Sequence, residues 1–178
     1  MDGQSKLKSE AEAIIEDLGL LELLAPFGEA RVVGSVALNL IVKLDIDIHL
    51  LIRDGSTEDV ADRVYCELAA HDRVTKAHVH DYRSQGGLKV GIDAYPGESG
   101  DWSIDIWVTD KPETVGFNLV DRLSRNLTAD DRKAILSIKR HYVDRGIYKA
   151  GLGSLICEAV ADRGIRTVED FESFLRHG

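Results

Sequence analysis

Two aspartates, Asp45 and Asp47, alternate with apolar residues in the segment DIDIHLLI over Asp45–Ile52. Side chains two residues apart on a β-strand point to the same face, so the two carboxylates and His49 would lie together. Carboxylate oxygens are preferred ligands of hard divalent cations, and a bound cation relieves the repulsion between close like charges. Transfer of a nucleotidyl group needs such cations at the attacked phosphorus. The pattern therefore predicts a metal site suited to this chemistry.

Gly34 and Ser35 precede this pair, where a short β-branched segment, Ala30–Val33, gives way to a helical pattern over Val36–Val42. A glycine at this turn lets a phosphate approach the backbone closely. Unpaired amides at the start of a helix, together with the serine hydroxyl, could bind a triphosphate. We expect the Gly34-Ser35 turn to bind the nucleotide.

A third carboxylate is expected from Asp105. In the segment Trp102–Val108, apolar residues take one face of a strand and leave Asp105 on the other face, where it could meet Asp45 and Asp47. Asp93 is a rival because it also alternates with apolar neighbours. Asp105 is favoured because its alternation is cleaner, whereas Asp93 soon runs into a Pro-Gly loop.

Periodicity and capping signals predict an α+β protein. Apolar residues recur at helical spacing over 5–24, with a second short turn at the end of that range. Further helices are expected over 57–70 and 128–145, around 152–160, and after a cap at Thr167. Strands are expected over 30–33, 45–52, 74–82, 88–95 and 102–108, with a hairpin at Ser84–Gly87. The expected architecture is a mixed β-sheet with flanking helices over residues 1–112, followed by a C-terminal helical subdomain over residues 113–178.

Other titratable clusters give weaker signals. His49 could contact phosphate or metal, or it could simply be a hydrogen-bonded neighbour of the aspartates, and the sequence leaves both open. His78 and His80 have no further partners at zinc spacing, so a surface strand is favoured. A basic and aromatic cluster in the helical part could bind triphosphate, although a solvated helix end is favoured. The cluster consists of Lys139, Arg140, His141, Tyr142, Tyr148 and Lys149.

The segment GSVALNLIVKLDIDI, from Gly34 to Ile48, resembles the signature of the DNA polymerase β-like nucleotidyltransferases. Ile104–Trp107 resembles the strand with that superfamily's third carboxylate, and 151–175 resembles the helical tail of small bacterial members. The resemblance implies a nucleotidyltransferase-type fold in which Gly34 and Ser35 hold the triphosphate. It also implies that Asp45, Asp47 and Asp105 are catalytic and bind Mg²⁺ or Mn²⁺. Leu44 departs from the usual polar residue or proline before the aspartates, and no acceptor motif is recognisable.

Composition restricts the partners. The 178 residues carry a net charge of -9, which disfavours long nucleic acid as a partner. No apolar run approaches the roughly 20 residues of a membrane-spanning helix, and the N-terminal residues show no targeting pattern. We therefore expect a cytoplasmic protein without a membrane partner. Cys66 and Cys157 are expected to be buried as small hydrophobes.

These features predict an enzyme that transfers a nucleoside monophosphate from a Mg-bound nucleoside triphosphate to a hydroxyl, with release of pyrophosphate. The expected acceptor is a small molecule or a protein. The alternative is a catalytically degenerate protein that binds a nucleotide or a partner. A metal-dependent nuclease is less favoured, because the Gly34-Ser35 turn would have no role in it.

Overall fold

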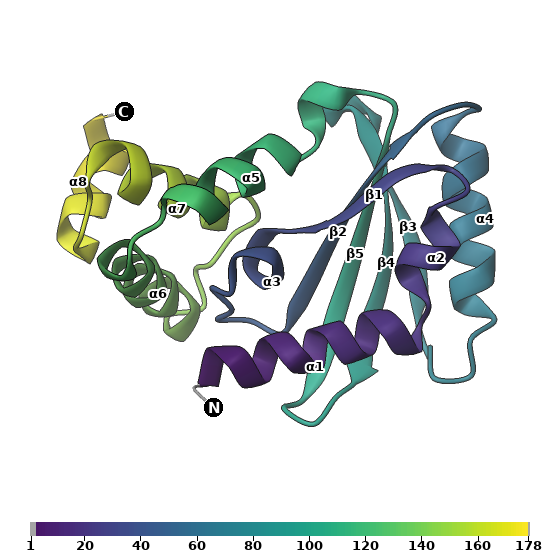
Figure 1. The fold of residues 1–178 in the computed structure, drawn as a ribbon, viewed down its shortest axis with the longest axis horizontal. Coiled ribbons are helices and arrows are strands. Elements are labelled where there is room, and N and C mark those ends of the chain that lie inside the picture. Colours follow the sequence, from purple (N-terminus) through teal and green to yellow (C-terminus); the bar gives the residue numbers. More distant parts are fainter. Residues whose placement is uncertain (1–2, 178) are drawn as a thin grey trace.

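The fold is described from a computed structural model that covers residues 3–177 (Figure 1). Five strands form one sheet in the order β1-β2-β5-β4-β3. Their bounds are β1 Gly28–Val33, β2 Asp45–Ile52, β3 Ala77–Tyr82, β4 Gly87–Pro96 and β5 Asp101–Thr109. Only the β2–β5 pairing is parallel among the strand pairs of this sheet. The predicted α+β class with a mixed sheet and flanking helices is confirmed.

One face of the sheet is buried under helices α1 (Gly3–Asp17), α2 (Leu20–Leu24) and α4 (Thr57–Ala69). Alternate β2 residues Ile46, Ile48 and Leu50 are fully buried in this layer. Removing apolar surface from water drives this packing. The opposite set of β2 side chains is therefore directed to the other face, as the period-two pattern predicts.

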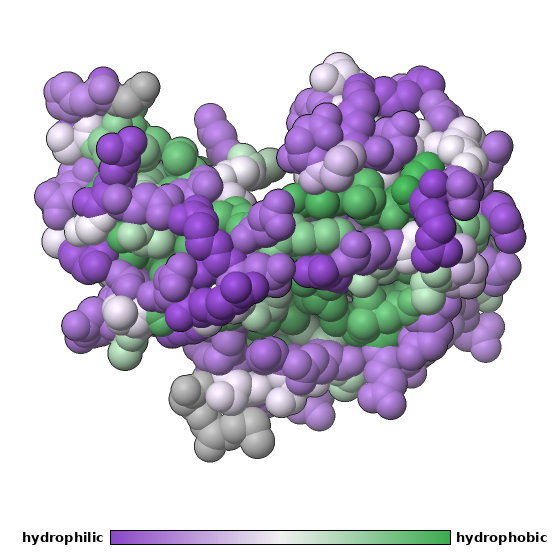
Figure 2. Space-filling model, turned by 45° about the horizontal axis from the view of Figure 1, so that its top comes forward, coloured by the Kyte–Doolittle hydropathy of each residue, from purple (hydrophilic) through white to green (hydrophobic). Residues whose placement is uncertain are grey.

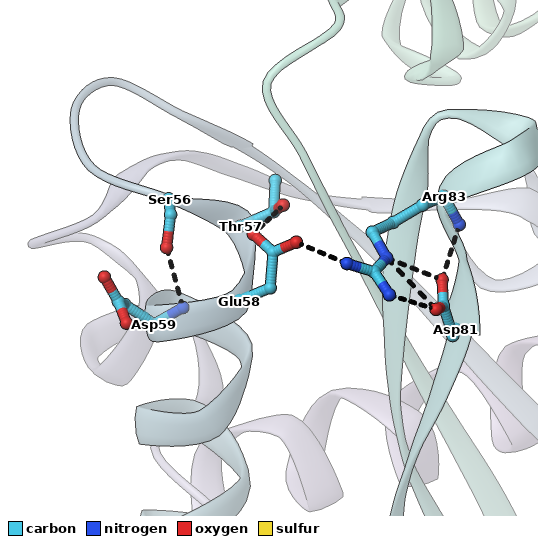
Figure 3. Close-up of polar contacts among 6 residues, drawn as sticks. All are labelled: Ser56, Thr57, Glu58, Asp59, Asp81 and Arg83. Atoms are coloured by element: carbon cyan, nitrogen blue, oxygen red, sulfur yellow. Dashed lines mark hydrogen bonds and ion pairs between the residues drawn. The ribbon is translucent and has the colours of Figure 1, made fainter.

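Hydrogen bonds and ion pairs connect the start of α4 to the hairpin formed by β3 and β4. The Ser56 hydroxyl accepts a hydrogen bond from the Asp59 amide at 3.1 Å and caps the helix (Figure 3). Arg83, in the short 3-10 helix η1 (Arg83–Gln85), bridges Glu58 at 3.0 Å and Asp81 at 2.5 Å (Figure 3). The predicted capping signal and the hairpin are both confirmed.

Four helices, α5 (Phe117–Asn126), α6 (Ala129–Asp144), α7 (Leu152–Arg163) and α8 (Val168–His177), follow a short 3-10 helix η2 (Pro112–Thr114). These helices lie together at one side of the sheet (Figure 1). Side chains of all four contribute to a second hydrophobic cluster, separate from the one under the sheet. Leu38 and Leu40, from the first part of the chain, also belong to this second cluster. The division of domains near residue 112 therefore stays a prediction.

Two predicted elements differ from the structure. Helix α3 spans only Gly34–Leu38, because Asn39 adopts a left-handed conformation with φ 53° and ends it. Leu40 and Ile41 then enter separate hydrophobic clusters instead of continuing the predicted helix. Strand β3 begins at Ala77, later than predicted, and Val74 packs on the core from the preceding loop.

Helix α5 was not predicted from the sequence. Its N-cap residue, Gly116, provides no side-chain hydrogen bond, so the usual start signal is missing. Cys157 is buried as expected, but the prediction for Cys66 is wrong, since this residue lies on the exposed side of α4. Within residues 3–177, no helix is both long enough and apolar enough to cross a membrane.

Candidate active site

The sequence-predicted residues line one cavity of about 390 Å³, between the sheet and the C-terminal helices. The surface is hollowed between these two parts of the molecule (Figure 2). The predicted residues that line it are Gly34, Ser35, Asp45, Asp47 and Asp105. The fold thus brings together side chains that are far apart along the chain.

Strand pairing places the three carboxylates side by side. In the parallel β2–β5 pair, Asp47 lies directly opposite Asp105, while Asp45 lies opposite Ser103 on the same face. Neighbouring strands are about 4.8 Å apart, so Asp47 and Asp105 are adjacent across the ladder. The central β2 and β5 strands therefore supply a compact acidic group.

The environment of these carboxylates opposes their ionisation. Burial, followed by the charges of Asp45 and Asp105, raises the pKa of Asp47 to about 7. Burial also raises the pKa of Asp45, against the opposing influence of Lys43 and Lys139. A cation bound between these groups would favour their charged forms.

Asp45 provides independent support for a cation site. Its Oδ1 atom is buried and has no hydrogen-bond partner among the described residues. A buried carboxylate oxygen without a partner is costly, and coordination of a divalent metal would satisfy it. The buried Asp45 carboxylate therefore fits a ligand of the Mg²⁺ or Mn²⁺ that the resemblance implies.

The three carboxylates do not form a finished metal site by themselves. In residues 3–177, no three His, Cys, Asp or Glu side chains converge in a way that could hold a metal ion. Asp105 is engaged elsewhere, because Lys89 Nζ donates to its Oδ2 at 2.9 Å. Cation binding by all three would require this ion pair to rearrange.

Gly34 is required by the close approach of Asp47. Its φ of +62° is left-handed, and a Cβ at this position would lie 2.7 Å from Asp47 Oδ2. A larger residue would thus be strained and would also displace the carboxylate. The glycine places the β1–α3 backbone against the acidic group, so a phosphate at this turn would lie beside a cation held by the carboxylates.

Lys139 is a site residue that the sequence analysis assigned incorrectly. It is only 2% exposed, and its Nζ donates to Ser35 Oγ at 3.0 Å and to the Leu40 carbonyl at 2.8 Å. Burial lowers its pKa, whereas the charges of Asp45 and Asp47 act in the opposite direction. The favoured interpretation, a solvated helix end, is therefore wrong for Lys139. The missed signal was its place on the apolar face of α6, beside Ile135 and Ile138.

The rest of the predicted basic and aromatic cluster divides into two groups. Tyr148 and Lys149 line the cavity, and Lys43 Nζ lies 5.9 Å from the centre of the Tyr148 ring. Tyr142 instead packs edge-on against Phe171 in the helical core, and His141 lies near Glu172 of α8. Only part of the cluster can therefore reach a nucleotide.

The histidines and Asp93, which the sequence left as alternatives, lie at different places in the fold. His49 lines the cavity, but its Nδ1 accepts a hydrogen bond from the Gly116 amide at 3.0 Å, and burial lowers its pKa to about 4. His49 is thus a neutral side chain that is hydrogen-bonded to the Gly116 backbone and lines the same cavity as the aspartates. Asp93 lies on β4, paired with Lys76 at 2.5 Å, and is not among the residues that line the cavity. His78 and His80 lie on the edge strand β3.

Comparison with known proteins adds evidence from structure alone, since no protein-family model and no curated protein sequence matches the chain significantly. A mutant of the Cid1 poly(U) polymerase bound to MgATP aligns with a TM-score of 0.62 and 19% identity, over 81% of this chain and 45% of its own. A cytoplasmic RNA terminal U-transferase aligns with a TM-score of 0.55 and 22% identity, over 79% of this chain and 41% of its own.

A bacterial enzyme shares the same fold. The STING-associated CdnE c-di-GMP synthase from Capnocytophaga granulosa aligns with a TM-score of 0.54 and 16% identity, over 88% of this chain and 59% of its own. This chain therefore spans less than two thirds of each of these neighbours. At these identities, the similarity establishes the fold.

Proposed function

Because the chain has the fold of the DNA polymerase β-like nucleotidyltransferases, we propose that it transfers a nucleoside monophosphate to a hydroxyl acceptor. The main support for this proposal is that one cavity is lined by Asp45, Asp47 and Asp105 together with the Gly34-Ser35 turn. Unrelated functions recur on one fold, so the argument for this function rests on the site.

In the proposed reaction, the acceptor oxygen attacks the α-phosphorus in line with the bond to the bridging oxygen. That bond breaks, and pyrophosphate leaves with its electron pair. The acceptor proton passes to the Asp105 carboxylate, which then releases it to water. Mg²⁺ or Mn²⁺, held by Asp45, Asp47 and Asp105, would stabilise the charge that develops on the phosphate oxygens.

The other lining residues have proposed roles in binding. Gly34 offers its backbone to the triphosphate, and Ser35 offers a hydroxyl that Lys139 already orients. Lys139 and Lys43 add positive charge close to the carboxylates, as their influence on Asp45 indicates. Preorganised charges of this kind stabilise a phosphoryl transition state in a site that excludes water.

The acceptor proposed here is a small molecule or a protein. One neighbour is named as an RNA terminal U-transferase, but this chain covers only part of that protein and carries a net charge of -9. An acidic surface repels a phosphate backbone, so long nucleic acid stays a disfavoured acceptor. A cytoplasmic location is part of the proposal.

A degenerate, nucleotide-binding protein is the second candidate, and the Lys89–Asp105 ion pair favours it. That pair occupies a carboxylate oxygen at 2.9 Å, and catalysis requires the same carboxylate. Such a protein would bind a triphosphate without releasing pyrophosphate. Binding and turnover must therefore be measured separately.

Thermal unfolding with each of the four common nucleoside triphosphates, with and without Mg²⁺, tests the binding part of the proposal. A ligand at about 100 times its Kd stabilises the native state by roughly 2.7 kcal/mol, which corresponds to a rise in Tm of about 5–10 °C in a protein of this size. We expect one or more triphosphates to produce this rise only with Mg²⁺. Asp45→Asn should abolish it.

Asp54→Asn is the matched control, because it removes one negative charge in an exposed turn after β2. It should retain the full Mg²⁺-dependent rise. If no triphosphate stabilises the wild-type protein, the nucleotide site itself is refuted. An equal rise in Asp45→Asn would refute the assigned metal ligand.

A further inference from the structure

A second cavity, of about 420 Å³, lies beside Asp105 on the half of the sheet formed by β5, β4 and β3. Asp105 lines both this cavity and the one that contains Gly34 and Asp47. Its other walls are Lys76, His78, His80 and Lys89, together with Asp93 and Ser103. We call it the β3–β5 cavity; the proposed function leaves it unused.

The pairing of strands β3, β4 and β5 determines which residues lie at the bottom of the β3–β5 cavity. Gly91 of β4 lies between His78 on β3 and Asp105 on β5, paired with both. A Cβ on Gly91 would lie 2.2 Å from His78 Nε2, so the imidazole lies directly across the glycine backbone. Gly91 thus brings a histidine nitrogen towards the carboxylate, where a larger residue would hold them apart.

The walls of the β3–β5 cavity suit an anion. None of the side chains that line it is apolar, so a hydrophobic group would gain little there. Lys89 Nζ contacts Asp105, Lys76 Nζ contacts Asp93, and His78 Nδ1 lies 3.7 Å from Asp93. An imidazole carries an N–H donor, so His78 and His80 can each donate a hydrogen bond to an anion.

Of the two lysines in the β3–β5 cavity, Lys89 is the one in contact with Asp105. Its side chain is 25% exposed, and it forms an ion pair with Asp105. When Asp105 serves the reaction, Lys89 needs another anion, and an anionic group on the acceptor would supply it. The two lysines of the cavity would then face one carboxylate, Asp93, besides the incoming anion.

We propose that the β3–β5 cavity binds the acceptor and that this acceptor is a small molecule with a hydroxyl and a phosphate group. The inference rests on the proposed function, in which two substrates must meet at Asp105. The triphosphate lies on the Asp47 side of Asp105, and the acceptor lies on the Lys89 side. Lys89, His78 and His80 bind the acceptor phosphate, which directs its hydroxyl to Asp105.

Calorimetric titration with paired probes tests this inference. The pairs are ribose and ribose 5-phosphate, glucose and glucose 6-phosphate, and adenosine and AMP. The first cavity is filled beforehand with Mg²⁺ and the α,β-methylene analogue of the triphosphate that stabilises the protein most. Because that analogue cannot be cleaved, the titration reports binding in the β3–β5 cavity without turnover.

At least one phosphorylated probe should bind about ten-fold or more tightly than its unphosphorylated partner, since hydrogen bonds to charged groups are strong. Lys89→Met should reduce that preference to about three-fold or less, and His80→Gln, on an exposed strand edge, should also weaken it. Lys6→Met removes an exposed lysine paired with Glu98 elsewhere on the surface and should leave the preference intact.

The outcomes separate the two proposals. If the methylene analogue does not bind, the proposed function fails before the acceptor is tested. If the analogue binds but no phosphorylated probe is preferred, the acceptor inference is wrong and the proposed function stands. A preference that survives both Lys89→Met and His80→Gln would place the phosphate outside the β3–β5 cavity, which also overturns the inference.

Discussion

Asp105→Asn is expected to lower the rate of pyrophosphate release by at least about 1,000-fold while the protein stays folded. Asp105 lies opposite Asp47 across the β2–β5 ladder and lines both cavities. The amide cannot take the acceptor proton, and it binds a divalent cation poorly, so two contributions are lost together. A coupled assay for pyrophosphate measures the loss, and circular dichroism checks the fold.

Asp93→Asn is the matched control for this experiment, since the sequence alone leaves Asp93 as the rival carboxylate. The Asp93 side chain is 40% exposed and pairs with Lys76, and such surface pairs contribute little. Asp93 lines the proposed acceptor cavity but takes no proton and binds no cation in the proposed reaction, so the rate of Asp93→Asn at saturating acceptor should stay within about three-fold of the wild type. An inactive Asp93→Asn protein beside an active Asp105→Asn protein would reverse the assignment.

Asp47→Asn is expected to raise thermal stability at pH 8 when divalent metal is absent. Burial and two neighbouring carboxylates raise the pKa of Asp47 to about 7, from an ordinary value of 3.8. Between these values the folded state holds a proton that the unfolded state has lost, so stability falls as pH rises from about 4 to 7. Above pH 7, Asp47 is ionised in both states, and its buried charge lowers the free energy of unfolding by roughly 2–4 kcal/mol. The variant should therefore gain about 5 °C or more in Tm at pH 8.

The pH dependence makes this second prediction specific. Below about pH 3, Asp47 is protonated in both states, so the gain should largely disappear. Mg²⁺ should stabilise the wild-type protein at pH 8 and leave Asp47→Asn nearly unchanged. Asp54→Asn, which removes an exposed charge, should show no gain at either pH. A variant that is less stable than the wild type at pH 8 would show that Asp47 is not under electrostatic strain.

The acidic part of the site was predictable because it depends on short-range rules. The alternation in β2 fixes which face Asp45 and Asp47 share, and the same rule applied to β5 selects Asp105. The sequence does not reveal that β2 and β5 are neighbours, since β4 and β3 intervene along the chain. The resemblance to the nucleotidyltransferase signature is what indicated that these two strands are adjacent.

The role of Lys139 depends on long-range packing and was therefore missed. The local sequence pattern favoured a solvated helix end for Lys139. In the fold, the face of α6 that carries Lys139 is directed towards Ser35. Helix α5 was missed for a different reason. Phe117, Val120 and Leu123 follow helical spacing, but the helix starts without a side-chain cap. The helical spacing of these three apolar residues was therefore the signal in the sequence that could have predicted α5.

The central claim is that this chain cleaves a triphosphate between its α- and β-phosphorus atoms and transfers the nucleotidyl group. The most direct measurement uses a triphosphate labelled at the α-phosphorus, with Mg²⁺ and the phosphorylated and unphosphorylated hydroxyl compounds used above. Labelled nucleoside monophosphate should appear on an acceptor in equal amount to the pyrophosphate released, and Asp105→Asn should stop both. Binding of the triphosphate with no label transferred and no pyrophosphate, or release of orthophosphate alone, would contradict the account.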